Sequence, residues 1–149
     1  MFSTGFFTDY RDGQSYATID INGTTWLAQN LNYNNTESYC YEDDEKNCTD
    51  QGRLYTWESA QTACPKGWEL PNQYEWEKVL RTLRETFYCK GCYEDFTLGG
   101  KSGFEASLSG LRRGEDGKFY DLNRNGNYWS KATPNDLSLI HISEPTRPY

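Results

Sequence analysis

The chain has 149 residues, with 15 Lys and Arg against 22 Asp and Glu, so its formal net charge is −7. This length suits a single domain with one hydrophobic core. The acidic balance argues against nucleic acids and anionic membranes as partners, because the chain could not neutralise a run of phosphates. The sequence also has no apolar stretch of the roughly 20 residues that a membrane-spanning helix needs.

Aromatic residues make up 16% of the chain, from 12 Tyr, 5 Trp and 7 Phe. Each large ring buries about 150–250 Å² when it packs in a core. We therefore expect most of these rings to pack in the core and turns of a loop-rich domain, although aromatic rings also stack on sugars. The predicted core anchors are the five tryptophans: Trp26, Trp57, Trp68, Trp76 and Trp129.

The first part of the chain has the pattern of a β-hairpin. Residues 15–28 alternate apolar and polar side chains around the pair Asn22-Gly23. An Asn-Gly pair between such segments is typical of a two-residue type I′ turn. Residues 29–52 are polar and include the acidic run Glu42–Glu45, so we predict a long surface loop there.

Two helices are predicted next. Thr56 can cap the first helix, which Pro65 ends. Asn72 and Glu75 have the spacing of a capping box at the start of the second helix. The second helix then shows an amphipathic stripe, formed by Trp76, Val79, Leu80, Leu83 and Phe87. Short strands over residues 104–130 complete an α+β order, which differs from that of a β-α-β sheet.

The last thirteen residues read LSLIHISEPTRPY, and Leu137–Arg147 resembles the in-frame translation of a transposase-type sequencing adapter. We interpret residues 137–149 as a non-native, adapter-derived tail, leave it out of the fold prediction, and expect the natural chain to continue past Asp136. His141, in this tail, is the single histidine of the chain. Ser–His–Asp and Cys–His nucleophile pairs and His-ligated zinc sites are therefore not expected.

Three segments carry a family resemblance: residues 7–33, 40–79 and 102–130. They include the motifs WESAQTAC, LPNQYEW and DLNRNGNYW, in this order. Together the three segments resemble the Fibrobacter succinogenes major paralogous domain. The resemblance spans residues 7–136 as one domain that is truncated at its C-terminus. It implies a C-type-lectin-like α+β fold with an N-terminal β-hairpin, two helices and short irregular strands. Formylglycine-generating sulfatase-modifying domains are distantly similar.

The family consists of cell-surface and secreted bacterial proteins, which favours disulfides among the five cysteines. By the family pattern, Cys64 pairs with a late cysteine that this chain lacks, so its thiol is expected to be free. Cys40 with Cys48 would close the acidic loop, and Cys89 with Cys92 would close an insertion. Four thiolates could instead hold zinc, but only Cys89 and Cys92 have the close spacing of a zinc knuckle.

Residues 121–126, DLNRNG, match the start of an EF-hand calcium loop. The last ligand position of such a loop would be Ala132, which cannot supply the required carboxylate. Lectin-like relatives bind calcium near a Gly-Asn-x-Trp segment, so the resemblance gives candidate ligands: Asp121, Asn123, Asn125 and Asn127. An ordinary Asn/Gly turn is the simpler interpretation.

The resemblance implies a non-catalytic extracellular or cell-surface domain for adhesion or carbohydrate and surface recognition. Its partner would be a polysaccharide or cell-wall surface, and calcium is the one cofactor considered. The opening residues, MFSTGFF, show no signal-peptide pattern, and the sequence sets no oligomeric state. Two alternatives stay open. One is a relative of the formylglycine-generating oxidases, which would need cysteines after Cys92, and the other is a structural module of a larger surface protein.

Overall fold

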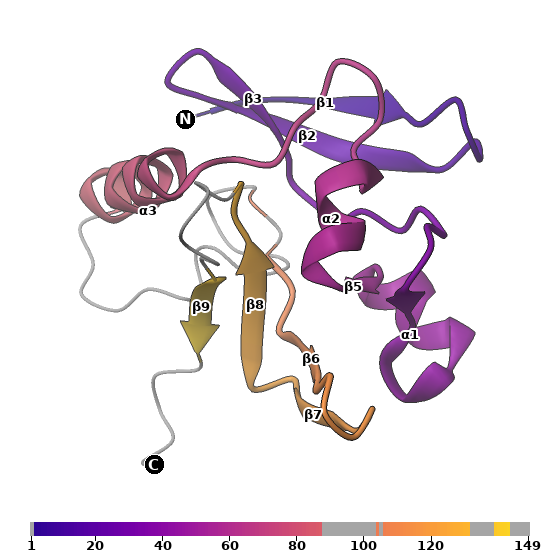
Figure 1. Ribbon diagram of the computed structural model, residues 1–149. Coiled ribbons are helices and arrows are strands. Elements are labelled where there is room, and N and C mark those ends of the chain that lie inside the picture. Colours follow the sequence, from indigo (N-terminus) through magenta and orange to yellow (C-terminus); the bar gives the residue numbers. More distant parts are fainter. Residues whose placement is uncertain (1, 88–103, 105, 132–138, 144–149) are drawn as a thin grey trace.

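The computed structural model describes residues 2–87, 104, 106–131 and 139–143 (Figure 1). The first sheet consists of β1 (Ser3–Thr8), β2 (Ser15–Ile21) and β3 (Thr24–Leu27). The second sheet pairs β4 (Ser38–Tyr39) with β5 (Leu54–Tyr55). The third sheet consists of β7 (Phe119–Leu122), β6 (Ser109–Arg112), β8 (Asn125–Trp129) and β9 (Leu139–Ser143). The helices are α1 (Glu45–Gln51), α2 (Trp57–Ala63), α3 (Gln73–Phe87) and a short 3₁₀ helix, η1 (Tyr41–Asp43). None of these helices is long and apolar enough to cross a membrane. The predicted α+β class is confirmed.

The predicted hairpin turn between β2 and β3 is also confirmed. Asn22 and Gly23 both have positive φ, at 53° and 81°, which is the geometry of a type I′ turn. The register places Ile19 opposite Trp26, and both side chains are buried. β1 pairs antiparallel with the other side of β2, and the sequence analysis did not predict this strand.

The long surface loop predicted over residues 29–52 is wrong in its second half, which forms β4, η1 and α1. Asp44 caps α1, because its carboxylate accepts a hydrogen bond of 3.0 Å from the backbone N–H of Lys46. Cys48 is the one buried residue of α1. The helix therefore lacks the apolar stripe by which a sequence usually indicates a helix.

The two helices predicted from their capping residues, α2 and α3, are present. Thr56 Oγ1 accepts a hydrogen bond of 3.2 Å from the backbone N–H of Ser59 at the start of α2. At α3 the capping box is reciprocal: Glu75 N–H donates to Asn72 Oδ1 at 2.8 Å, and Asn72 N–H donates to Glu75 Oε1 at 3.1 Å. Both caps satisfy backbone N–H groups that a helix start otherwise leaves unpaired.

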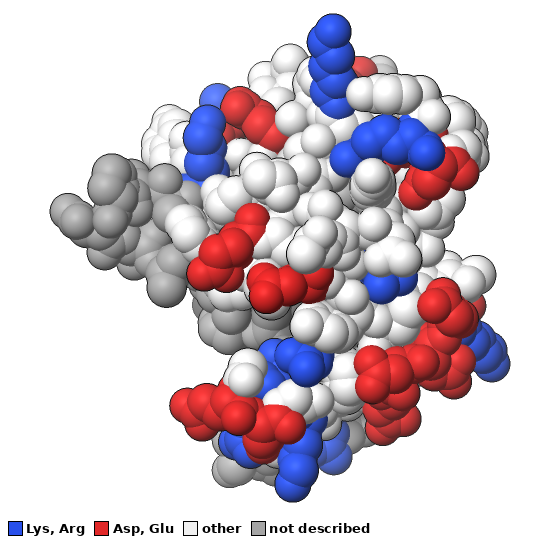
Figure 2. All heavy atoms as spheres, turned by 45° about the vertical axis from the view of Figure 1, so that its right-hand side comes forward, with Lys and Arg blue, Asp and Glu red and all other residues white. Residues whose placement is uncertain are grey.

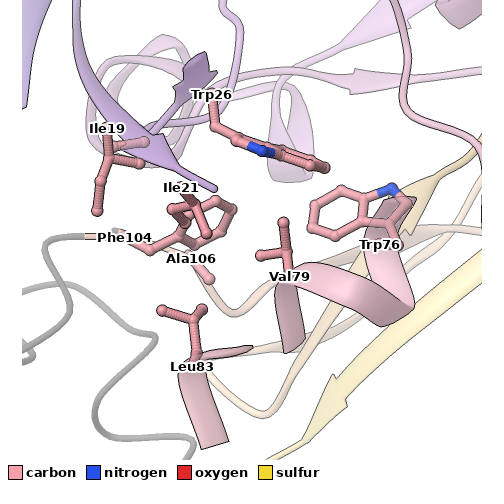
Figure 3. Packing of buried hydrophobic residues seen from close by; sticks show 9 residues of the cluster. Ile19, Ile21, Trp26, Trp76, Val79, Leu83, Phe104 and Ala106 are labelled. Carbon is pink, nitrogen blue, oxygen red and sulfur yellow. The ribbon is translucent and has the colours of Figure 1, made fainter. Parts of the chain in front are cut away.

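The core lies where the first sheet, α3 and the segment before β6 meet (Figure 3). The Trp26 and Trp76 ring centroids are 5.1 Å apart, and each lies 6.2 Å from the Phe104 ring. The predicted stripe of α3 faces this core through Trp76, Val79 and Leu83, with Leu80 packed against it. The side chain of Phe87 lies outside the described residues. The buried cluster consists of Ile19, Ile21, Trp26, Ala28, Trp76, Val79, Leu83, Phe104 and Ala106.

The C-terminal sheet has the strand order β7-β6-β8-β9. β6 and β8 are parallel, and the other pairs are antiparallel. Its last strand, β9, consists of residues 139–143, which the sequence analysis left out of the fold together with the rest of the tail. The structure differs, because β9 pairs with β8 from Asn125 opposite Ser143 to Trp129 opposite Leu139.

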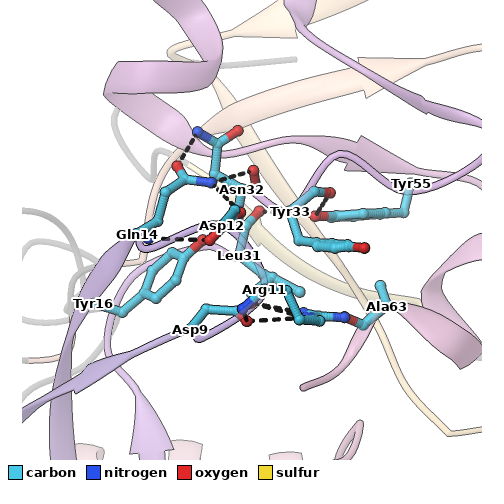
Figure 4. Close-up of polar contacts among 10 residues, drawn as sticks. All are labelled: Asp9, Arg11, Asp12, Gln14, Tyr16, Leu31, Asn32, Tyr33, Tyr55 and Ala63. Atoms are coloured by element: carbon cyan, nitrogen blue, oxygen red, sulfur yellow. Dashed lines mark hydrogen bonds and ion pairs between the residues drawn. The ribbon is translucent and has the colours of Figure 1, made fainter. Parts of the chain in front are cut away.

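A buried ion pair fixes the turn between β1 and β2 to the end of α2 (Figure 4). Asp9 is 0% exposed, and its carboxylate accepts a hydrogen bond of 2.7 Å from Arg11 Nη2. The same nitrogen donates to the carbonyl of Ala63 at 2.8 Å, where a cation is favourable because it faces a helix C-terminus. The guanidinium also lies 3.6 Å from the centroid of the Tyr33 ring. These hydrogen bonds to Arg11 hold the pKa of Asp9 below its usual value.

Candidate ligand-binding groove

A groove with a volume of about 830 Å³ opens between β3, α2, β6 and β8. Ligand sites in proteins usually have volumes of roughly 300–1,000 Å³ and walls that are mostly apolar with a few polar groups. All five tryptophans of the chain line this groove: Trp26, Trp57, Trp68, Trp76 and Trp129. The convergence of every tryptophan on one groove makes it the candidate functional site.

The five predicted core anchors differ in how deeply they are buried. Trp26 and Trp76 are 9% and 6% exposed and belong to the core, where they form the back of the groove. Trp57, Trp68 and Trp129 are only half-buried. Their rings form walls of the groove and keep part of their surface open to solvent, because no other element covers it in the described part of the chain.

The indole N–H groups fall into two sets. Trp129 Nε1 donates to the Tyr55 carbonyl at 2.8 Å, and Trp76 Nε1 donates to the Trp129 carbonyl at 3.4 Å. The Nε1 atoms of Trp26 and Trp57 are buried and have no hydrogen-bond partner among the described residues. An unpaired buried donor costs about 1–3 kcal/mol. Two residues that line the groove therefore carry a buried indole N–H without a partner among the described residues.

Two tyrosines give the groove uncharged walls. Tyr55 donates its hydroxyl to the Tyr33 carbonyl at 2.7 Å, and Tyr128 donates to the carbonyl of Ser107. Burial raises the pKa of Tyr55 and that of Tyr128 well above the usual value for tyrosine. Both side chains therefore stay neutral at physiological pH, and neither is suited to accept or release protons in a reaction.

Carboxylates at the edge of the groove are provided by Glu58, Glu69 and Glu75. Glu69 lies 3.3 Å from Lys131 Nζ, and Glu75 is used in the capping box. In the view of Figure 2, charged side chains of both signs are scattered among uncharged surface. A further group of acidic side chains lies at its lower right, over the end of the molecule that holds α1.

Two arginines also line the groove. Arg53 is fully engaged: its Nε donates to Ser38 Oγ at 2.9 Å, and its Nη1 lies 3.5 Å from each sulfur of Cys40 and Cys48. Arg112 is held differently, because its guanidinium carbon lies 3.8 Å from the centroid of the Tyr39 ring. No hydrogen bond or ion pair reaches the Arg112 side chain from any residue that the structure describes.

The predicted Cys40–Cys48 disulfide is present and buried, with a Cα–Cα distance of 5.0 Å. The two sulfurs and a Glu45 carboxylate oxygen lie within 4.8 Å of one another, but the disulfide consumes both thiolates that a metal ion would need. Cys64 has a free, half-buried thiol that lines the groove, and burial raises its pKa. Cys89 and Cys92 lie outside the described residues.

The four calcium candidates lie where β7 ends and β8 begins. Asp121 and Asn123 have positive φ, at 67° and 62°, which short polar residues tolerate in turns. Asn123 Oδ1 accepts from Gln51 at 3.3 Å, and Asn127 Nδ2 donates to the Gly110 carbonyl at 3.2 Å. These contacts fit the turn interpretation. Calcium binding by Asp121, Asn123, Asn125 and Asn127 stays a prediction.

Comparison with known proteins gives one match. The family described as the Fibrobacter succinogenes major domain matches residues 8–144. No curated protein and no solved structure matches the chain.

Proposed function

The chain belongs to the Fibrobacter succinogenes major domain family, and from this premise we propose that it is a non-catalytic recognition domain that binds polysaccharide in its tryptophan-lined groove. Membership of this family suggests a surface-associated domain, and the proposed location is extracellular or at the cell surface. We include in the proposal a C-type-lectin-like fold, which the order of hairpin, two capped helices and irregular strands supports.

The observation that carries the proposal is the convergence of five tryptophans on one groove of about 830 Å³. A sugar ring has an apolar face of C–H groups, which packs well on a flat aromatic ring, and an edge of hydroxyl groups. Trp57, Trp68 and Trp129 offer half-exposed rings for the apolar faces. The Nε1 groups of Trp26 and Trp57, which have no partner among the described residues, offer donors for hydroxyl or ring oxygens.

The chemistry of the groove supports recognition over catalysis. Cys64, the thiol among the described lining residues, has a pKa raised by burial, whereas a catalytic cysteine needs a lowered pKa. No histidine that could activate a nucleophile is among the lining residues that the structure describes. Tyr55 and Tyr128 remain protonated because burial raises the pKa of each hydroxyl.

The test is binding to a glycan array, with and without calcium, followed by calorimetric titration of the tightest ligand. Trp57→Ala and Trp68→Ala each remove one half-exposed ring from the groove. We expect each to weaken binding about tenfold or more, because tryptophans dominate the energetics of recognition sites. Melting temperature and circular dichroism check that each variant keeps its fold.

Tyr74→Ala is the matched control, because Tyr74 is 65% exposed and does not line the groove. Its affinity should equal that of the unaltered chain. Equal losses for Tyr74→Ala and the tryptophan variants would argue against the groove as the binding site. Absence of binding to every glycan, in both calcium conditions, would favour the purely structural module instead.

A further inference from the structure

We infer that Arg112 recognises a carboxylate on the bound chain, so that the groove prefers polysaccharides that contain uronic acid residues over neutral ones. This inference rests on the proposed function and names the ligand class of that groove. Neither the family match nor the aromatic lining distinguishes an acidic glycan from a neutral one. The charged side chains of the groove differ in whether they already have hydrogen-bond partners within the protein.

Arg112 is the one lining cation whose donors are not used by the described residues. Arg53, the other lining arginine, donates to Ser38 and to both sulfurs of the disulfide. Arg112 is half-buried at the end of β6 and has five N–H donors and no acceptor. A partly desolvated guanidinium without an anion is unfavourable, and a bound carboxylate would remove that cost.

The ring of Tyr39 fixes the orientation of this guanidinium. The Arg112 carbon lies 3.8 Å from the Tyr39 centroid and 6.0 Å from the Phe119 centroid. Stacking covers a face of the planar group and leaves its edge, which carries the N–H donors, available for a ligand. Arginine binds a carboxylate through two parallel hydrogen bonds, which are stronger than neutral ones. The stacked arginine is thus preorganised to bind a planar anion.

Among the described residues that line the groove, no carboxylate is paired with Arg112. Glu69 is paired with Lys131, and Glu75 is held in the capping box. Glu58 is exposed and has no polar contact with Arg112. The exposed acidic run Glu42–Glu45 lies on η1 and at the start of α1, and at physiological salt its field is screened beyond about 8 Å. An isolated carboxylate on a mostly neutral chain can therefore approach Arg112.

The test compares matched pairs of soluble oligosaccharides of glucose, mannose and galactose. Each neutral oligosaccharide is paired with its counterpart oxidised to the uronic acid at the primary hydroxyl carbon. The measured quantity is the ratio of the two dissociation constants for the full chain, at physiological ionic strength and at higher salt. We expect the acidic member of at least one pair to bind about tenfold tighter, and this preference should shrink as salt is added.

Arg112→Gln should bring the ratio close to one, because glutamine keeps a polar side chain but loses the charge. Arg112→Lys should keep part of the preference, since lysine retains the charge without the two-pronged geometry. Arg81→Gln is the matched control: Arg81 is exposed on α3, outside the groove, and its loss should leave the ratio unchanged. Thermal melts of all three variants exclude loss of folding as the cause.

The outcomes separate this inference from the proposed function. Binding of neutral members with no acidic preference, or an unchanged ratio in Arg112→Gln, overturns the role of Arg112 and leaves polysaccharide binding intact. No binding to any neutral or acidic member contradicts the proposed function itself. An equal drop of the ratio in Arg81→Gln would assign the preference to net charge and would also overturn the role of Arg112.

Discussion

Trp129 donates its indole N–H to the carbonyl oxygen of Tyr55 over 2.8 Å, and so joins β8 to β5, two strands of different sheets. Its own carbonyl accepts the indole N–H of Trp76 at 3.4 Å. The ring of Trp129 is therefore a wall of the groove and also a connection between its two sides. The indole N–H groups of Trp57 and Trp68 make no such hydrogen bond with any described residue, which makes these two the better positions for testing ligand contact alone.

The first prediction follows from that hydrogen bond. Trp129→Phe keeps an aromatic ring in place but removes the donor to the Tyr55 carbonyl. We expect the free energy of unfolding to fall by about 1–3 kcal/mol, because the part-buried carbonyl of Tyr55 loses this donor. Urea unfolding followed by circular dichroism measures the change. Trp68→Phe serves as the control and should cost less, so equal losses in the two variants would contradict this role of Trp129.

Much of the local structure could be predicted from the sequence, because its signals are local. The pair Asn22-Gly23 indicates its own turn, and Asn72 with Glu75 indicates its own helix start, without information from the rest of the chain. α1 could not be predicted, because its buried side is a cysteine that the disulfide joins to Cys40, the residue before η1. Its acidic residues alone indicate only a solvated segment.

The groove was beyond sequence analysis for a different reason. Composition shows that the chain is rich in tryptophan. It does not show what fraction of each tryptophan ring the other elements cover. Whether Trp57 is a core residue or a wall depends on the distance between α2 and the C-terminal sheet. The buried ion pair was also missed, since Asp9 and Arg11 occur in a polar segment that resembles an exposed turn.

A second prediction concerns this ion pair. Asp9→Asn removes the partner of Arg11 and leaves a partly buried charge without its carboxylate. Breaking such a pair costs about 3–5 kcal/mol, and we expect a value near the lower end because Arg11 keeps its bond to the Ala63 carbonyl. Urea unfolding at neutral pH measures the loss. Asp50→Asn makes the same chemical change at an exposed position of α1, and a comparable loss there would show that Asp9 has no special role.

The third prediction is a dependence of stability on pH. The pKa of Asp9 is lowered in the folded state by its hydrogen bonds to Arg11. A lowered folded-state pKa means that the stabilisation is fully present above the unfolded value of about 3.9 and is lost as pH falls through the folded value. The free energy of unfolding, measured from neutral pH to strong acid, should therefore decrease as the pH falls below about 3.9. The decrease should be smaller in Asp9→Asn.

Asp116 titrates in the same acid range, because its hydrogen bonds to Arg113 lower its pKa to about 2. Asp116→Asn is therefore the appropriate comparison for Asp9→Asn in this series. The exposed pair should contribute less to the acid-dependent loss, since surface ion pairs are worth little. A pH profile that Asp116→Asn flattens more than Asp9→Asn would contradict the assignment to Asp9.

The last prediction uses the thiol of Cys64 as a reporter of the groove. Cys64 is free, half-buried and lines the groove, and burial raises its pKa. Because the thiolate is the reactive form, we expect a disulfide reagent such as Ellman's reagent to modify Cys64 at least about tenfold more slowly in the native chain than in urea. A bound oligosaccharide should slow the reaction further, and Cys64→Ser identifies the signal that belongs to this thiol. Rapid modification of the native chain would show that the Cys64 thiol is more exposed to solvent than its half-buried position implies. Modification that a saturating ligand leaves unchanged would place the ligand away from this wall of the groove.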